Sequence, residues 1–117
     1  YLVWLFEAFV TGNVSFQSFF RLIDESRLAE NFVASELLKA GHDAYFYQNA
    51  AELDFYIPKL QMGIEVKYKE KITRDDIKSL EKAQKKILVS KHTFETKGDT
   101  FILPIYFFPL LDLTHYV

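Results

Sequence analysis

The order of hydrophobic and polar residues predicts one long helix early in the chain. Over residues 26–39, apolar side chains recur at the three- and four-residue spacing that is typical of one helix face. Asp24, Glu25 and Ser26 offer N-cap side chains before this run, and Gly41 follows it, as glycine often does at a helix end. We therefore expect a helix that begins near Ser26 and ends shortly before Gly41.

The remainder of the chain has the pattern of strands with one further helix. Several runs alternate apolar and polar side chains with a period of two, which is typical of strands. Thr73 and Asp76 have the spacing of a capping box, so a second helix is expected to begin there and to end near Lys86. The predicted strands cover residues 44–48, 52–57, 62–69, 87–90 and 101–108. This order predicts an α/β fold with a central mixed β-sheet flanked by α-helices.

Length and composition exclude several classes of protein. A chain of 117 residues suits a single domain. The sequence contains no cysteine, which excludes disulfide frameworks, thiol catalysis and thiolate metal sites. No apolar stretch approaches the roughly 20 residues that a membrane helix needs. The composition favours a cytoplasmic globular protein, and we expect no membrane partner.

The first part of the chain differs from the rest. Residues 1–21 are mainly apolar and aromatic, with turn-forming residues at 11–13. Because the chain begins with Tyr1 and not with Met, we expect this segment to continue from an upstream region and to pack on the main domain, residues 22–117. The apolar character of this segment and of strand 101–108 also suggests a homodimer, which sedimentation would test.

Charge is distributed unevenly along the chain. Residues 1–58 contain three Lys/Arg and eight Asp/Glu, whereas residues 59–97 contain eleven Lys/Arg and six Asp/Glu. The net charge of −2 argues against a protein that binds nucleic acid through overall charge alone. The basic region could still form one face that meets phosphate groups, although a solvated lysine-rich helix explains the same pattern.

One carboxylate lies on the apolar side of the first predicted helix. Glu30 falls within about 100° of Ala29, Val33 and Leu37 when the helix is viewed along its axis. Placing an unpaired carboxylate there costs several kcal/mol. Glu30 is therefore a candidate functional residue, with a salt bridge or helix cap as the structural alternative.

Two further acids and a lysine fall on two neighbouring strands. Asp54 and Glu65 are eleven residues apart, and a short hairpin would bring their carboxylates together on one face. Period two places Lys67 on the same face as Glu65. Solvated acids and a surface ion pair are the structural alternatives. Together, the two carboxylates are typical ligands of Mg²⁺ or Mn²⁺, and Lys67 could offset charge that builds on a phosphate.

These residues resemble the motif of the PD-(D/E)xK nuclease superfamily, which has a restriction-endonuclease-like fold. More closely, AENFVASELLKAG at 29–41, ELDFYI at 52–57 and GIEVKYKE at 63–70 resemble the C-terminal nuclease-like module of uncharacterised archaeal and bacterial AAA-type ATPases. The resemblance covers roughly residues 22–92. One departure from the motif is Leu53, which stands where the motif has proline.

The resemblance implies a restriction-endonuclease-like core and a magnesium-dependent deoxyribonuclease, with DNA as substrate and an ATPase domain upstream. It assigns Asp54, Glu65 and Glu30 to the metal and Lys67 to positioning the attacking water. All four residues are thereby implied to be catalytic.

Three further residues near these motifs are candidates for supporting roles. Lys69 and Lys71 lie close to the proposed metal and are candidates for contacts with nucleic-acid phosphates. Gln84 matches only part of a glutamine motif of related nucleases, because Leu88 stands where those proteins have tyrosine. It is a candidate for a supporting role next to the metal ligands, and a buried amide is the alternative.

The alternative function is a catalytically silent nuclease-like domain that docks DNA or a protein partner to the ATPase. The ordered acids and Lys67 favour the enzyme, whereas the acidic overall charge favours the binding module.

Overall fold

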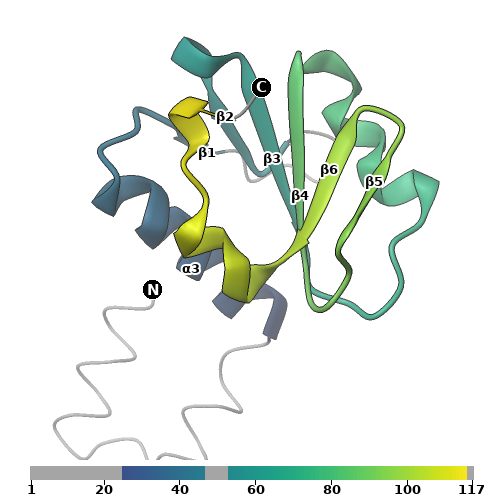
Figure 1. The fold of residues 1–117 in the computed structure, drawn as a ribbon. Coiled ribbons are helices and arrows are strands. Elements are labelled where there is room, and N and C mark those ends of the chain that lie inside the picture. Colours follow the sequence, from purple (N-terminus) through teal and green to yellow (C-terminus); the bar gives the residue numbers. More distant parts are fainter. Residues whose placement is uncertain (1–24, 47–52, 116–117) are drawn as a thin grey trace, which may run out of the picture.

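The computed structural model describes residues 25–46 and 53–115, which form a mixed β-sheet with helices on both of its faces (Figure 1). The α-helix is α3 (Glu25–Lys39). The strands are β1 (Tyr45–Phe46), β2 (Phe55–Ile57), β3 (Met62–Lys67), β4 (Lys85–Ser90), β5 (Glu95–Lys97) and β6 (Thr100–Pro104). Four 3₁₀ helices complete the described part: η1 (Pro58–Leu60), η2 (Arg74–Lys82), η3 (Ile105–Leu110) and η4 (Leu113–His115).

The six strands form one sheet in the order β1-β2-β3-β4-β6-β5. The three central strands β3, β4 and β6 run parallel, whereas β1, β2 and β5 add antiparallel pairs at the two edges. The connection from β3 to β4 contains η2, and the connection from β4 to β6 contains β5. Parallel strands need such crossover connections. This arrangement confirms the predicted α/β fold with a central mixed sheet. No helix in the described residues is long and apolar enough to cross a membrane.

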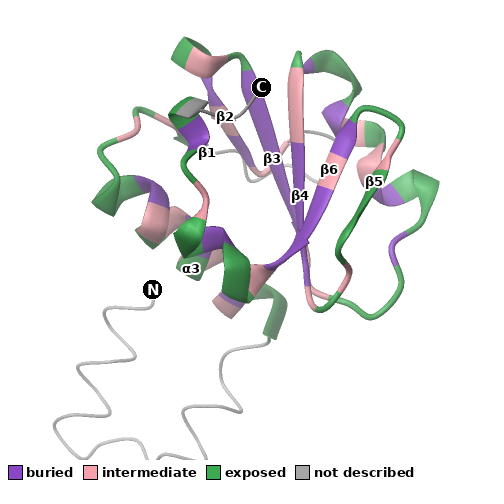
Figure 2. Ribbon diagram, in the orientation of Figure 1, coloured by how far each residue is buried: buried purple, intermediate pink, exposed green. Residues whose placement is uncertain are grey.

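Two hydrophobic clusters lie on opposite faces of the sheet. On β4, Ile87 and Val89 belong to the cluster that α3 covers, whereas Leu88 belongs to the cluster that η2 covers. All three side chains are fully buried, and Figure 2 shows burial concentrated in the central strands. A strand that is buried on both faces reads as a continuous apolar run, which explains why 87–89 shows no alternation in the sequence.

Helix α3 forms where the sequence predicts it. Ala29, Val33 and Leu37 recur at helical spacing and are buried against the sheet. The helix ends with a left-handed Gly41, whose φ is 78°. The backbone N–H of His42 donates to the Leu37 carbonyl at 3.1 Å, which is the bond expected at such a glycine-terminated end.

The second predicted helix is shorter and of a different type. The expected capping box is present, with the Thr73 N–H donating to Asp76 Oδ2 at 2.7 Å. The segment then forms the 3₁₀ helix η2, which ends at Lys82 instead of continuing to Lys86. The Lys85 N–H donates to the Gln61 carbonyl at 3.0 Å, so Lys85 already pairs beside β3. Competition from sheet pairing therefore shortens the helix.

The other boundaries differ in detail. The first two predicted strands are represented by the short strands β1 and β2, and residues 47–52 lie outside the described residues. The strand expected over 101–108 ends at Pro104, which is followed by the 3₁₀ helix η3. The sequence did not predict β5, which forms a hairpin with β6 through a turn at Gly98 (φ 64°). The predicted N-terminal segment, residues 1–21, lies outside the described residues.

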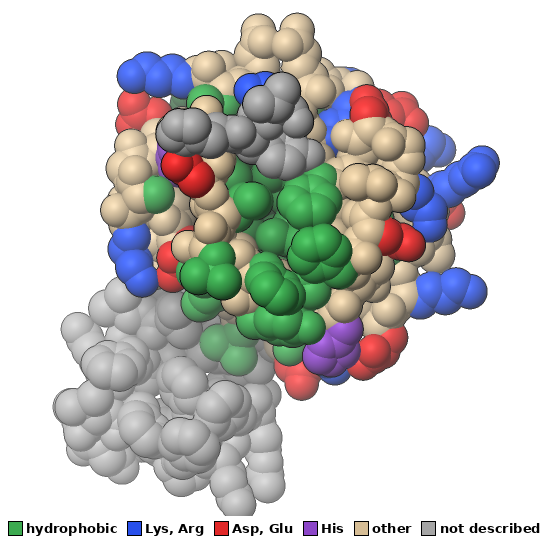
Figure 3. Space-filling model, viewed as in Figure 1, with side chains coloured by type: hydrophobic (Ala, Val, Ile, Leu, Met, Phe, Trp, Pro, Cys, Tyr) green, Lys and Arg blue, Asp and Glu red, His purple; other side chains and the backbone are tan. Residues whose placement is uncertain are grey.

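Three exposed aromatic side chains form a cluster, of which Tyr106 and Phe107 lie on η3 and Phe94 precedes β5. Phe94 and Phe107 have ring centroids 5.6 Å apart, and those of Tyr106 and Phe107 are 5.2 Å apart. Figure 3 shows hydrophobic side chains gathered on this face of the molecule. The homodimer, expected from residues 1–21 and 101–108, stays a prediction.

Candidate functional site

The β2–β3 hairpin places Asp54 opposite Glu65. Phe55 pairs with Ile64, so Asp54, one residue before β2, lies next to Glu65 on β3. The connection is short because η1 and a left-handed Gln61 (φ 51°) reverse the chain within a few residues. The hairpin that the eleven-residue spacing predicts is therefore present.

Close packing holds the two strands of this hairpin together. A Cβ added at Gly63 would lie 2.8 Å from Leu53 Cδ1 and 2.9 Å from Ala83 Cβ. Glycine is thus the residue that lets Leu53 pack across β3, immediately before Asp54. This contact helps to fix the position of the Asp54 backbone.

Backbone and side-chain hydrogen bonds orient the two acids. The Val66 N–H donates to Asp54 Oδ2 at 2.8 Å. The Ser79 hydroxyl, which comes from η2, donates to Glu65 Oε2. Glu65 is only 3% exposed and Asp54 is half-buried, so both acids lie in the layer between the sheet and η2.

The environment of Glu65 opposes its ionisation. Burial, followed by the hydrogen bond and the negative charge of Asp54, raises the pKa of Glu65 from 4.5 to about 8. The Ser79 hydroxyl and the positive charge of Lys67 act in the opposite direction but do not outweigh these effects. At neutral pH the neutral form of the Glu65 carboxyl group is therefore favoured.

Lys67 lies at the end of β3, two residues from Glu65 and on the same face. It is half-buried, and its charge favours the ionised form of Glu65. The predicted association of Asp54, Glu65 and Lys67 is thus present in the structure. Ser79 was missed, because a lone serine between Lys78 and Leu80 of a predicted helix carries no distinctive sequence signal.

Glu30 does not join this group. It lies on α3, which covers the sheet face formed by Ile64 and Val66, whereas Glu65 points to the η2 face. Within the described ranges 25–46 and 53–115, no group of three acidic or histidine side chains could hold a metal ion. The expected three-acid shell is therefore corrected to a pair, because strand alternation puts Glu65 on the face away from α3.

Gln84 also differs from its expected position. The sequence pattern places it on the apolar side of a continuous helix, but η2 ends at Lys82 and Gln84 is exposed. A supporting role beside the acids does not agree with this position. The helical period used for the prediction no longer applies beyond the end of η2.

The two lysines predicted to contact nucleic acid lie in the connection from β3 to η2. Lys69 Nζ is 2.7 Å from Asp76 Oδ1, so its charge is already paired. Lys71 is exposed. Their contact with phosphate groups stays a prediction, and Lys71 is the better placed of the two.

The chemistry of the acid pair fits a hard divalent cation. Two adjacent carboxylates repel one another, and the charge of Asp54 is one cause of the raised pKa of Glu65. A cation such as Mg²⁺ binds carboxylate oxygens and would relieve this repulsion. Asp54 and Glu65 are the residues that would hold it.

Comparison with protein families gives one match, to a domain of unknown function, over residues 25–108. Neither the curated proteins nor the solved structures give a match. Domains of this matched family usually lie C-terminal to AAA-type ATPases. Since the match covers α3, every strand and the acid pair, the chain belongs to the family described as a domain of unknown function (DUF4143).

Proposed function

We propose that this domain hydrolyses phosphodiester bonds of DNA with the help of a divalent cation, Mg²⁺ or Mn²⁺, as the C-terminal module of a larger ATPase. The observation that carries the proposal is the pairing of Asp54 with Glu65 beside Lys67. The family's frequent position next to ATPase domains supports the second part.

Each residue of the group has a chemical task in this proposal. Asp54 and Glu65 hold the cation through their carboxylate oxygens, and the Val66 N–H and Ser79 hydroxyl keep those oxygens in place. When bound, such a cation polarises a phosphoryl oxygen and lowers the pKa of a water molecule. Lys67 offsets the negative charge that develops on the phosphate.

Metal binding and cleavage test the proposal on the same protein samples. We expect Mn²⁺ calorimetry to show binding to the wild type, and Asp54→Asn and Glu65→Gln to weaken it at least about tenfold. The same two variants are expected to lose metal-dependent nicking of a plasmid. Asp75→Asn is the matched control, because it removes one exposed carboxylate from η2 without touching the pair. Unchanged nicking in Asp54→Asn would overturn the proposal.

A second candidate function is a nuclease-like module that binds DNA or a partner without cutting. The burial of Glu65, closed over by Ser79, favours this candidate, since a working site must open to its substrate. The same experiment separates the two functions. DNA binding by a wild type that neither binds Mn²⁺ nor nicks plasmid would establish the binding module.

A further inference from the structure

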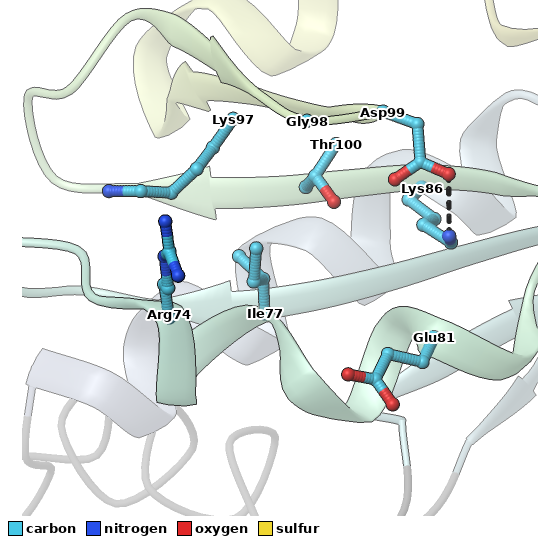
Figure 4. Close-up of a pocket in the computed structure, with 8 residues that line it drawn as sticks. All are labelled: Arg74, Ile77, Glu81, Lys86, Lys97, Gly98, Asp99 and Thr100. Carbon is cyan, nitrogen blue, oxygen red and sulfur yellow. Dashed lines mark hydrogen bonds and ion pairs between the residues drawn. The ribbon is translucent and has the colours of Figure 1, made fainter.

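A second polar site lies on the η2 face of the sheet, between η2 and the β5–β6 hairpin. It is a pocket of about 360 Å³ with basic, acidic and apolar residues in its lining (Figure 4). None of its lining residues belongs to the group formed by Asp54, Glu65 and Lys67. Its chemistry can therefore be considered separately from that of the acid pair.

One end of this pocket is electrically balanced. Lys86 Nζ is 2.6 Å from Asp99 Oδ2, and the Lys86 side chain is only 15% exposed. The hydrogen bond from Lys86 holds the pKa of Asp99 below its usual range. The two charges neutralise one another, so this end of the pocket offers little net charge to a ligand.

The other end is positively charged. Figure 4 shows the side chains of Arg74, from η2, and Lys97, from β5, both ending at this end of the pocket. Among the residues that the structure describes, Arg74 forms no ion pair, and Lys97 Nζ reaches only the Ile72 carbonyl, at 3.5 Å. The remaining acid of the lining, Glu81, lies further along η2. Two cations at the same end of a pocket repel, and an anion between them would remove the repulsion.

We propose that this pocket binds a phosphate group between Arg74 and Lys97. A guanidinium offers a planar fork of N–H donors, and an ammonium offers a compact charge, so together they match the several oxygens of a phosphate. Thr100, from β6, also lines the pocket, on the side nearer the Lys86–Asp99 ion pair (Figure 4). The pocket has room for the group together with water. The phosphate could be free or part of a nucleic-acid backbone.

Titration of the whole chain with inorganic phosphate at constant ionic strength tests the site, with amide chemical shifts as the readout. We expect shifts in η2 and the β5–β6 hairpin, and affinity at least about fivefold weaker in Arg74→Gln and in Lys97→Gln. Lys82→Gln is the matched control, because it removes one exposed charge at the end of η2 outside the pocket. Its affinity should equal that of the wild type.

A parallel titration with a short DNA oligonucleotide, followed by fluorescence anisotropy, identifies the source of the phosphate. Loss of both affinities in the two variants supports a site open to free phosphate and to backbone phosphate. Loss for the oligonucleotide alone assigns the site to the backbone, and loss for inorganic phosphate alone assigns it to small ligands. Equal weakening by Lys82→Gln, or no effect of Arg74→Gln and Lys97→Gln on either probe, would overturn the proposal. Mn²⁺ binding by the acid pair is a separate measurement, so the two proposals can fail independently.

Discussion

Glu65 is buried and lies next to the negative charge of Asp54, and both effects raise its pKa. Its folded-state pKa of about 8 lies above the ordinary value of 4.5, so the folded protein binds an extra proton between these two pH values. The contribution of Glu65 to the stability of the fold is therefore greatest at low pH. It falls as pH rises from about 4.5 to about 8 and changes no further above that range. The carboxyl group that is proposed to hold a cation thus destabilises the metal-free fold when it is ionised.

Glu65→Gln should remove this pH dependence. Glutamine has the shape of the protonated carboxyl group, accepts from Ser79 and carries no charge that needs solvation. In the presence of a chelator, we expect the variant to match the wild type near pH 5 and to exceed it by on the order of a few kcal/mol at pH 9. Urea denaturation across this pH range measures the difference. Parallel stability curves for the two proteins would show that Glu65 ionises normally in the fold.

At the scale of elements, η2 depends on the side chains at its start. Asp76 accepts from the Thr73 N–H and pairs with Lys69. Its burial opposes ionisation, but Lys69 and the Thr73 hydrogen bonds outweigh it and hold the pKa of Asp76 below its usual range. A lowered pKa stabilises the fold above the ordinary pKa of the group, and this contribution is lost as pH falls through the folded-state value.

We therefore expect Asp76→Asn to lower the free energy of unfolding by about 1–2 kcal/mol at pH 7. The difference from the wild type should shrink as pH falls through the folded-state pKa of Asp76, because the wild-type carboxyl group then also becomes neutral. Chemical denaturation at several pH values provides the measurement. Asp75→Asn, at the exposed neighbouring position, should change stability little. A destabilisation that stays constant with pH would contradict the electrostatic explanation.

The β2–β3 hairpin makes a second prediction at this scale. Gly63→Ala should destabilise the protein by about 1–3 kcal/mol, because the new methyl group would crowd Leu53 and Ala83. Adding Ala83→Gly removes one of these contacts. The double variant should therefore lose less stability than the sum of the two single variants, which a double-mutant cycle of urea denaturation measures. Strict additivity would mean that the methyl group does not contact Ala83.

The same elements show what the sequence could predict about the site. Alternation along a strand fixes which side chains share a face, so the meeting of Asp54 with Glu65 and Lys67 followed from spacing and a short turn. Glu30 could not be placed in this way. Helical periodicity identifies the buried side of α3, but it does not say which face of the sheet that side covers. Gln84 was misplaced for a related reason, since the period used for it assumed an α-helix where a 3₁₀ helix ends early.

Across the whole molecule, β4 is the strand on which both layers depend. It pairs with β3 and β6, and its side chains enter both hydrophobic clusters. In contrast, β5 lies at an edge of the sheet and pairs only with β6. The sequence predicted the apolar run in β4 but could not predict β5, whose Glu95, Thr96 and Lys97 have no apolar alternation. Edge pairing of this kind depends on the neighbouring strand rather than on the local sequence.

This difference predicts how local stability is distributed. Amide protons of β4 should exchange only through global unfolding, whereas those of the edge strand β5 should exchange through local opening. Leu88 is fully buried, so Leu88→Ala should lower global stability by about 2–5 kcal/mol. Native-state hydrogen exchange should then show the protection of β4 amides falling by the factor that corresponds to the lost free energy of global unfolding. The protection of β5 amides should hardly change. Leu38→Ala, at an exposed position of α3, is the control and should leave β4 protection unchanged. Equal loss of protection in β4 and β5 with Leu88→Ala would mean that the sheet opens as one unit.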